Sequence, residues 1–184
     1  MHPLDWAIVD DELHSWFNDR TRDTAASLYG RGLYETMSAY WPTADKDPSA
    51  NDTMREYRRM WLAMPKIVFS KTLNEPVDWP NTRLVAGDAV ETVRDLKETE
   101  DAGSMRTMGS LSVCRSLLEA GLVDRYRVVV FPVITGSTGS DRIYDGYPDV
   151  ALDMVSSRSF DGRIQLLEYV PRVLAGPPGV SDGP

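Results

Sequence analysis

Three short segments of the sequence combine glycine, hydroxyl and cationic residues in a pattern typical of phosphate binding. They are Tyr29-Gly30-Arg31-Gly32-Leu33, Ser70-Lys71-Thr72 and Met108-Gly109-Ser110-Leu111-Ser112. Glycine lets the backbone approach a ligand closely, and hydroxyl groups and cations bind phosphate or ribose oxygens. The expected ligand is therefore a phosphate-bearing molecule.

Each segment also has a plainer explanation. The first could be a tight turn with a surface arginine, the second a polar loop, and the third a helix start capped by Ser110 or Ser112. A glycine turn alone is a weak motif, and the spacing is not the Gly-x-Gly-x-x-Gly of a Rossmann fold. The three together are more specific, because one long anionic cofactor could span them.

Hydrophobic periodicity places all three segments at the ends of predicted strands. Strands are expected over 24–29, 66–70 and 104–108, and helices over 31–40 and 110–120 follow the first and third segments. The first N–H groups of a helix are free to bind an anion. Parallel sheets bind their ligands at the carboxyl ends of their strands, which is where the three segments lie.

The remaining pattern completes an α/β chain. Val9, Leu13, Trp16 and Phe17 predict a helix within 5–22, and Asp88 with Glu91 forms a capping box that opens another helix. A further helix is expected over 53–64, and further strands over 83–86 and 127–131, of which the second reads as a central strand. Two more strands, 151–160 and 163–170, are expected to form a hairpin around Asp161-Gly162. Loops are expected over 42–52, 74–81 and 135–147. These elements predict a mostly parallel central sheet with an antiparallel C-terminal hairpin and helices on both faces.

Composition narrows the class of protein. The 184 residues carry a net charge of -8 without a basic stripe, which argues against nucleic-acid binding. No apolar run approaches a membrane span, and the N-terminus has no secretory signal pattern. One cysteine, Cys114, and two histidines, His2 and His14, exclude the common structural zinc sites, and no metal is expected. We therefore expect a cytoplasmic, globular protein.

The chain resembles the dihydrofolate reductase-like family that includes the RibD C-terminal (riboflavin biosynthesis reductase) domain. The resemblance spans about residues 4–171 and is carried by Leu4-Asp5-Trp6, Tyr29-Gly30-Arg31, Tyr34-Glu35, Tyr40-Trp41-Pro42, the run from Pro65 to Leu73, Gly109-Ser110, the run from Leu117 to Asp124 and the run from Phe131 to Gly136. It implies a dihydrofolate reductase-like three-layer α/β sandwich that binds NADPH.

The resemblance also assigns roles to the three segments. Gly30, Arg31, Gly32 and Leu33 would meet the cofactor phosphates, and Ser70, Lys71 and Thr72 would lie by the adenosine 2′-phosphate. The pyrophosphate would be held by Met108, Gly109, Ser110, Leu111 and Ser112. The reaction implied is hydride transfer from NADPH to a C=O or C=N carbon of a small, heterocyclic substrate. The alternative is a catalytically impaired binding protein of the same fold.

Two departures from the family pattern bear on this alternative. Gly32 and Leu33 stand where family members usually carry a basic residue and a threonine. The reductase domain is expected over residues 1–171, followed by a flexible Pro/Gly-rich tail over 172–184. Within this domain the family's first strand, with its Ser-Leu-Asp-Gly-like turn, has no counterpart. The sheet is then expected to carry an exposed edge or gap.

The sequence leaves the substrate side of the site open. Trp6 and Trp41 are candidate walls of a substrate pocket, and core packing explains them equally well. No catalytic acid is assigned. The candidates Asp10, Asp11 and Glu12 are better explained as the exposed first turn of a helix, where the helix dipole favours acidic residues. Cys114 reads as a buried structural thiol.

The expected partners are a small-molecule substrate and a second copy of the chain. Five Trp, eight Tyr and eight Met residues supply side chains enriched in the cores of interfaces. The late hairpin over 151–170 is expected near a sheet edge that a symmetric partner could cover. These features predict a homodimer.

Overall fold

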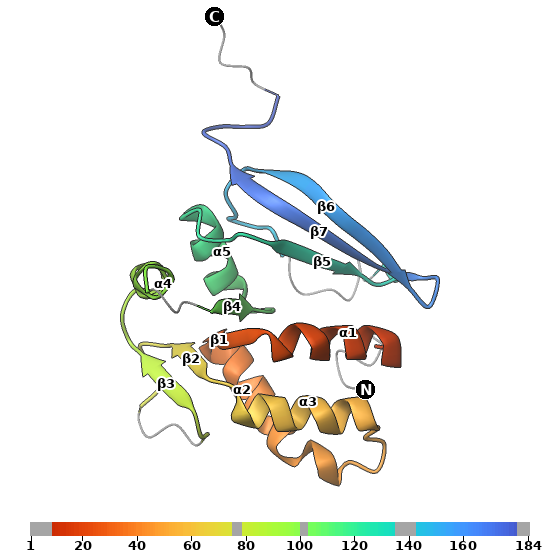
Figure 1. Ribbon diagram of the computed structural model, residues 1–184. Helices are drawn as coiled ribbons and strands as arrows, with labels where there is room; N and C mark the ends of the chain where they lie inside the picture. Colours follow the sequence, from red (N-terminus) through yellow and green to blue (C-terminus); the bar gives the residue numbers. More distant parts are fainter. Residues whose placement is uncertain (1–8, 75–78, 100–102, 135–142, 180–184) are drawn as a thin grey trace, which may run out of the picture. The chain divides into compact units, whose positions relative to one another are not determined.

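The computed structural model describes residues 9–74, 79–99, 103–134 and 143–179, which fall into two compact units (Figure 1). One unit comprises residues 13–116, and the other comprises residues 117–184 with the segment before residue 13. In chain order the elements are α1 (Asp11–Arg22), β1 (Thr24–Gly30), α2 (Arg31–Tyr40), the 3-10 helix η1 (Trp41–Lys46), α3 (Asp52–Ala63), β2 (Lys66–Phe69), β3 (Thr82–Val85), α4 (Ala89–Lys97), β4 (Ser104–Thr107), α5 (Leu111–Glu119), β5 (Tyr126–Val130), β6 (Val150–Phe160) and β7 (Ile164–Val173).

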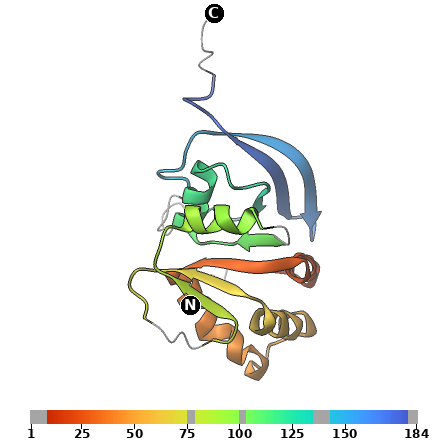
Figure 2. The same ribbon diagram turned by 60° about the vertical axis from the view of Figure 1, so that its left-hand side comes forward.

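The first unit is built on a four-stranded parallel sheet in the order β3-β2-β1-β4 (Figure 2). β1 is central: Tyr29 is opposite Val68 of β2, and Leu28 is opposite Thr107 of β4. Because all four strands run the same way, the residues that follow β1, β2 and β4 emerge at one end of the sheet. This end is where the three candidate segments begin.

Successive strand residues face opposite sides of the sheet, so each face has its own helices. Tyr29 and Val68 form a buried cluster with Tyr34 of α2 on one face, and Met37 of α2 also packs against the Tyr57–Trp61–Met64 cluster of α3. Gly30 faces the other side, where a Cβ atom would lie 3.6 Å from Val113 Cγ2 of α5. The expected helices on both faces are thus present.

Local signals explain several element boundaries. Asn51 Oδ1 accepts the Met54 N–H at 2.9 Å and caps α3, and Asp88 Oδ1 accepts the Val90 N–H at 2.7 Å and caps α4. α5 ends in a glycine turn, where Gly121 has φ 68° and its N–H donates to Leu118 O at 3.0 Å. Of these, the Asp88 cap was predicted from the sequence, whereas the Asn51 cap was not.

The buried layer beneath the parallel sheet contains a lysine. Lys66 of β2 is 1% exposed, and its Nζ donates to Met64 O at 2.9 Å and lies 4.5 Å from the centre of the Trp61 ring. Trp61 is itself fully buried and donates from Nε1 to the Tyr29 hydroxyl at 3.2 Å. Burial lowers the pKa of Lys66 from 10.5 to about 8, because the charged form is poorly solvated there.

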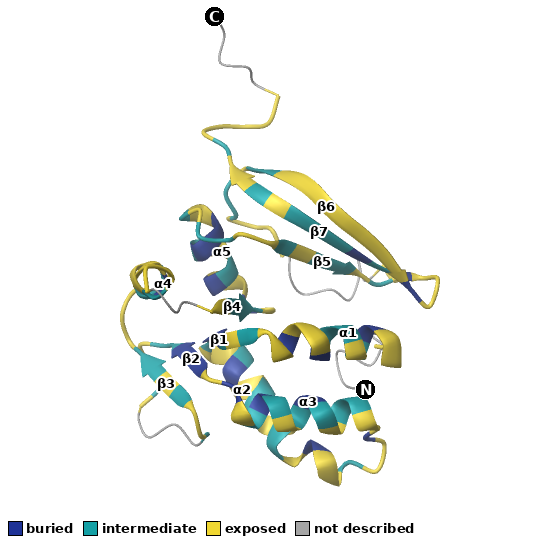
Figure 3. Ribbon diagram, viewed as in Figure 1, coloured by how far each residue is buried: buried dark blue, intermediate teal, exposed yellow. Residues whose placement is uncertain are grey.

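The second unit contains a three-stranded antiparallel sheet in the order β5-β7-β6. β6 and β7 form the predicted hairpin, whose turn residues Asp161 and Gly162 have φ angles of 52° and 65°. The register shifts between Met154 and Ser156, which makes Val155 a bulge residue. β6 is an edge strand and is coloured almost entirely as exposed in Figure 3.

The structure corrects three details of the sequence-based expectations. The segment 42–52 is not entirely a loop, because η1 occupies residues 41–46 and Pro42 fits the first turn of a helix. The strand near 127–131 is not central: β5 pairs with β7 alone among the described strands. The second strand of the hairpin does not end at residue 170, because β7 continues through Pro171 to Val173. Over these last residues β6 is its only described neighbour, so the missing N–H of Pro171 interrupts no pairing with a further strand.

The parallel and antiparallel strands therefore belong to two sheets rather than to one. Within the described residues β4 pairs only with β1, so β4 and β5 are both edge strands. The α/β class, with its parallel strands and antiparallel C-terminal hairpin, is confirmed.

Lys66 gives a testable pH dependence of stability. Between about pH 8 and pH 10.5 the unfolded state holds a proton on Lys66 that the folded state has lost, so stability should rise with pH in that window. The difference in unfolding free energy between the wild type and Lys66→Met should rise by about 1.4 kcal/mol per pH unit there and be flat below pH 8. Chemical denaturation across this range measures it. The exposed Lys46→Met variant is the control; a flat wild-type-minus-K66M difference would contradict the assignment.

Candidate functional site

The first candidate segment forms the junction between β1 and α2. Gly30 is the residue before α2, in extended conformation, and no side chain caps the start of this helix. Arg31 is half-exposed; its Nε donates to Glu35 Oε1 at 2.7 Å and its Nη1 donates to Thr72 Oγ1 at 2.8 Å. The helix start thus offers free amide groups, while part of the charge of Arg31 is balanced by Glu35.

The third segment meets the first through one hydrogen bond. Ser110 Oγ accepts the backbone N–H of Gly30 at 2.8 Å, although the two residues are 80 positions apart, and Ser110 is 5% exposed. Gly109 before it has φ +75°, a conformation that favours glycine. Ser110 precedes α5, but its hydroxyl is directed to Gly30 rather than to its own helix.

The first turn of α5 contains two backbone amides that no described side chain caps. Across the described part of the chain, no side chain accepts a hydrogen bond from the amides of Ser112 or Val113. Met108 and Leu111 beside it are exposed, as is Ser112. Two helix N-termini without a side-chain cap therefore start from strand ends that Gly30 and Ser110 hold together. Such a pair of N-termini is suited to an anion.

The second segment turns back after β2. Ser70 Oγ accepts the N–H groups of Thr72 at 3.2 Å and Leu73 at 3.1 Å, which is a compact local turn. Thr72 links this turn to Arg31. Lys71 is exposed, and no partner for it occurs among the residues that the structure describes. The turn therefore presents one uncompensated cation at the end of the sheet.

All three segments are thus brought together in the first unit, as their positions after parallel strands predict. Leu33, one of the departures from the family pattern, packs in the Tyr29–Tyr34–Val68 cluster and lies 3.9 Å from where a Cβ atom of Gly109 would be. It therefore has a packing role at the same junction. A Cβ at Gly32 would meet nothing within 4 Å, so this position borders open space.

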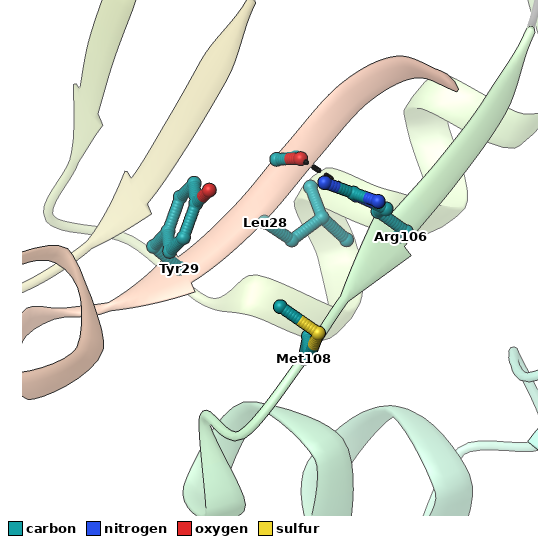
Figure 4. Close-up of a pocket in the computed structure, with 5 residues that line it drawn as sticks. Leu28, Tyr29, Arg106 and Met108 are labelled. Atoms are coloured by element: carbon teal, nitrogen blue, oxygen red, sulfur yellow. Dashed lines mark hydrogen bonds between the residues drawn. The ribbon is translucent and has the colours of Figure 1, made fainter. Parts of the chain in front are cut away.

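A small pocket opens beside this junction (Figure 4). Its lining comes from β1 and from the end of β4: Ser27, Leu28, Tyr29, Arg106 and Met108. Tyr29 directly precedes Gly30 and Met108 directly precedes Gly109, so the pocket adjoins the two open helix starts. Burial raises the pKa of the Tyr29 hydroxyl, which favours its protonated form.

Arg106 was not anticipated from the sequence. It is half-buried and donates from Nε to Ser27 Oγ at 3.3 Å, from Nη1 to Thr21 Oγ1 at 2.6 Å and from Nη2 to Tyr57 Oη at 3.3 Å. The available signal was a charged residue in the middle of a predicted strand, Ser104 to Met108. An arginine is rarely buried in a strand unless it has a partner or a function.

The other sequence candidates lie elsewhere. Trp41 packs in an aromatic cluster, 4.4 Å from the Tyr57 ring and 6.3 Å from the His14 ring, and it does not line the pocket. Its role as a pocket wall stays a prediction, and Trp6 lies outside the described residues. Cys114 is half-buried with its Sγ 3.9 Å from Thr107 Oγ1, and burial raises its thiol pKa. An unreactive thiol fits this environment.

Comparison with known proteins agrees with the fold and with the order of the motifs. The model of the RibD C-terminal domain matches residues 3–166. The uncharacterised Bacillus subtilis protein YyaP is 29% identical over 167 residues, which are 90% of this chain and 83% of YyaP. No helix in the described residues is long and apolar enough to span a membrane.

Solved structures share the fold at low sequence identity. A protein from Shewanella sp. PV-4 assigned to riboflavin biosynthesis has a TM-score of 0.67 at 16% identity, covering 92% of this chain and 88% of its own. The Saccharomyces cerevisiae riboflavin biosynthesis reductase Rib7 has a TM-score of 0.55 at 18% identity, covering 89% and 82%. These likenesses show a shared α/β fold. This chain belongs to the RibD C-terminal domain family.

The bond between Gly30 and Ser110 gives a prediction about stability. Ser110→Ala leaves the part-buried Gly30 N–H without its acceptor, so the unfolding free energy should fall by about 1–2 kcal/mol. Ser112→Ala, at an exposed position of the same helix start, should change it by less than about 0.5 kcal/mol. Urea denaturation of the two variants makes the comparison. Equal losses would show that the Ser110 hydroxyl is not what joins the two strand ends.

Proposed function

We propose that this protein is an NADPH-dependent reductase of the riboflavin-pathway type, which transfers hydride to a C=O or C=N carbon of a small heterocyclic substrate. The observation that carries the proposal is the meeting of three segments distant in sequence, joined by the Gly30–Ser110 and Arg31–Thr72 hydrogen bonds. Membership of the RibD C-terminal domain family supports it. The yeast and Thermotoga maritima proteins of the same fold are reductases by name, and this chain covers 82% and 50% of them.

The residues present fit the phosphate groups of such a cofactor. The amides at the starts of α2 and α5 would hold the pyrophosphate, as helix N-termini bind anions. Lys71, with the hydroxyls of Ser70 and Thr72, would hold the adenosine 2′-phosphate. The open space at Gly32 leaves the first of these sites unobstructed.

When bound, NADPH supplies the hydride. The chain supplies binding and orientation, since the starts of α2 and α5 would fix the phosphates beside the ends of β1 and β4. The Tyr29 hydroxyl accepts from Trp61 Nε1, and burial raises its pKa, so it stays protonated.

Turnover is the direct test of this function. NADPH oxidation should be measured with dihydrofolate, with ribosylaminopyrimidines and with simple carbonyl compounds. Oxidation that depends on one class of substrate supports the reductase. Binding of NADPH without turnover of any of them would identify the alternative, a binding protein of the same fold that has lost its activity.

The placement of Lys71 predicts a preference for NADPH over NADH. The 2′-phosphate distinguishes the two cofactors, and a hydrogen-bonded charge pair contributes about 1.5–3 kcal/mol. Fluorescence titration should therefore give at least about tenfold tighter binding of NADPH, and Lys71→Met should remove most of that ratio. Lys46→Met, an exposed lysine away from the junction, is the control. Equal affinities of the wild type for the two cofactors would refute the preference.

We also propose that the protein is a homodimer formed through β6. This edge strand exposes Leu152, Met154 and Val155 at 41%, 61% and 50%. Val170 and Val173 of β7 are exposed as well. An unpaired edge with apolar side chains is a surface that a second copy can cover.

Light scattering at micromolar concentration tests the dimer. We expect a mass of about twice 20.6 kDa, and a mass near 20.6 kDa for the double variant Leu152→Lys, Met154→Lys, since charges on an edge strand oppose pairing. Lysine substitutions at Ser157 and Ser159, also exposed on β6, are the matched control. A wild-type mass that stays at 20.6 kDa as concentration rises rejects the dimer.

A further inference from the structure

Arg31 lies where a cation does not stabilise its own helix. It is the first residue of α2, and no acidic residue lies in the first turn of this helix. The helix dipole favours negative charge at that end, and in the ion pair with Glu35 the arginine is the N-terminal member, the reverse of the order that stabilises a helix best. Both side chains are half-exposed, so the pair contributes little to stability. Helix stability therefore does not explain this cation.

Two acceptors from different parts of the first unit hold the Arg31 guanidinium group. Glu35 Oε1, on the same helix, accepts from Nε at 2.7 Å, and Thr72 Oγ1, in the turn after β2, accepts from Nη1 at 2.8 Å. Thr72 is itself fixed, because its N–H donates to Ser70 Oγ at 3.2 Å. A planar group that is held at two of its nitrogens has one orientation. The contacts of Arg31 thus fix the direction of its charge.

The same two contacts leave most of the donors of Arg31 unused. A guanidinium group has five N–H donors, and these bonds use one on Nε and one on Nη1. The donors that remain, on Nη1 and Nη2, can bind the oxygens of a phosphate group. Because the Cα–Cβ bond of a helical residue tilts toward the N-terminus, the side chain leaves α2 on the side of its uncapped amides. The free donors and these amides can therefore serve one anion.

We propose that Glu35 is a positioning residue for the anion-binding site: it holds the Arg31 guanidinium group so that the free N–H donors are presented to a phosphate group of the ligand. The carboxylate acts through Arg31 and does not touch the anion, which its own charge would repel. A long side chain that is ordered beforehand loses less conformational freedom when the ligand binds. This inference rests on the proposed function for the identity of the ligand and adds the residue that preorganises its site.

Glu35→Gln and Glu35→Met test the role, because they remove the same charge and differ in the acceptor oxygen. Gln and Met are both good helix formers, so α2 is retained in each. Glu35→Gln should bind NADPH, and also inorganic pyrophosphate, at least about fivefold more tightly than Glu35→Met, which is the effect of immobilising one long side chain. Titration calorimetry measures the affinities. The same two changes at Glu91, which is exposed on α4, are the control and should give equal affinities.

The Nε–H NMR signal of Arg31 reports the orientation of the guanidinium group without any ligand. Its exchange with water should be slow in the wild type and in Glu35→Gln, and fast in Glu35→Met, because only the first two provide an acceptor oxygen. Arg31→Met assigns the signal by removing it. Circular dichroism shows whether each variant is folded, and Glu35→Ala takes the place of Glu35→Met if that variant is not.

The outcomes separate this role from the proposed function. Equal affinities of Glu35→Gln and Glu35→Met, or an Nε–H signal that Glu35→Met leaves unchanged, would overturn the positioning role even if the wild type binds NADPH. Binding of pyrophosphate but not of NADPH, with the difference between the two variants retained, would support the role and reject the cofactor. A wild type that binds neither anion would overturn both.

Discussion

The hydrogen bond from the Gly30 N–H to Ser110 Oγ is the contact on which the arrangement of the site depends. Parallel pairing brings the ends of β1 and β4 to the same edge of the sheet, and this bond fixes how the two chains leave it. No described side chain accepts a hydrogen bond from the amides of Ser112 or Val113 at the start of α5. One side chain thus joins the two strand ends beside the helix starts, where backbone amides are suited to an anion.

Cationic side chains lie in two places in the first unit, at the strand ends and beneath the parallel sheet. At the strand ends, Lys71 is exposed and Arg31 shares its charge with Glu35, which suits a phosphate that water can also reach. Beneath the sheet, Lys66 and Arg106 are held by a backbone carbonyl and by hydroxyls. Neutral partners leave a positive potential in a region of low dielectric, where a single negative group on a ligand has the greatest effect. Only the first region was visible in the sequence.

The sequence predicted what local chemistry and strand direction determine. The glycine and hydroxyl segments were found because each follows an apolar strand, and Asp88 acts as a helix cap regardless of the tertiary fold. The division into two sheets was not predictable, since the pattern of Val128 to Val130 does not reveal which strand will pair with β5. Arg106 was missed because its partners come from β1, α1 and α3, and no spacing along the chain records that meeting.

The central claim is that the three segments act together as one binding site for a dinucleotide. The most direct measurement is the change in backbone amide NMR signals of the full chain when NADPH is added. The account predicts that the amides of Gly32, Lys71 and Ser112 shift along one saturation curve, with a single dissociation constant. Shifts that are confined to one segment, or that follow different curves, would contradict a shared site.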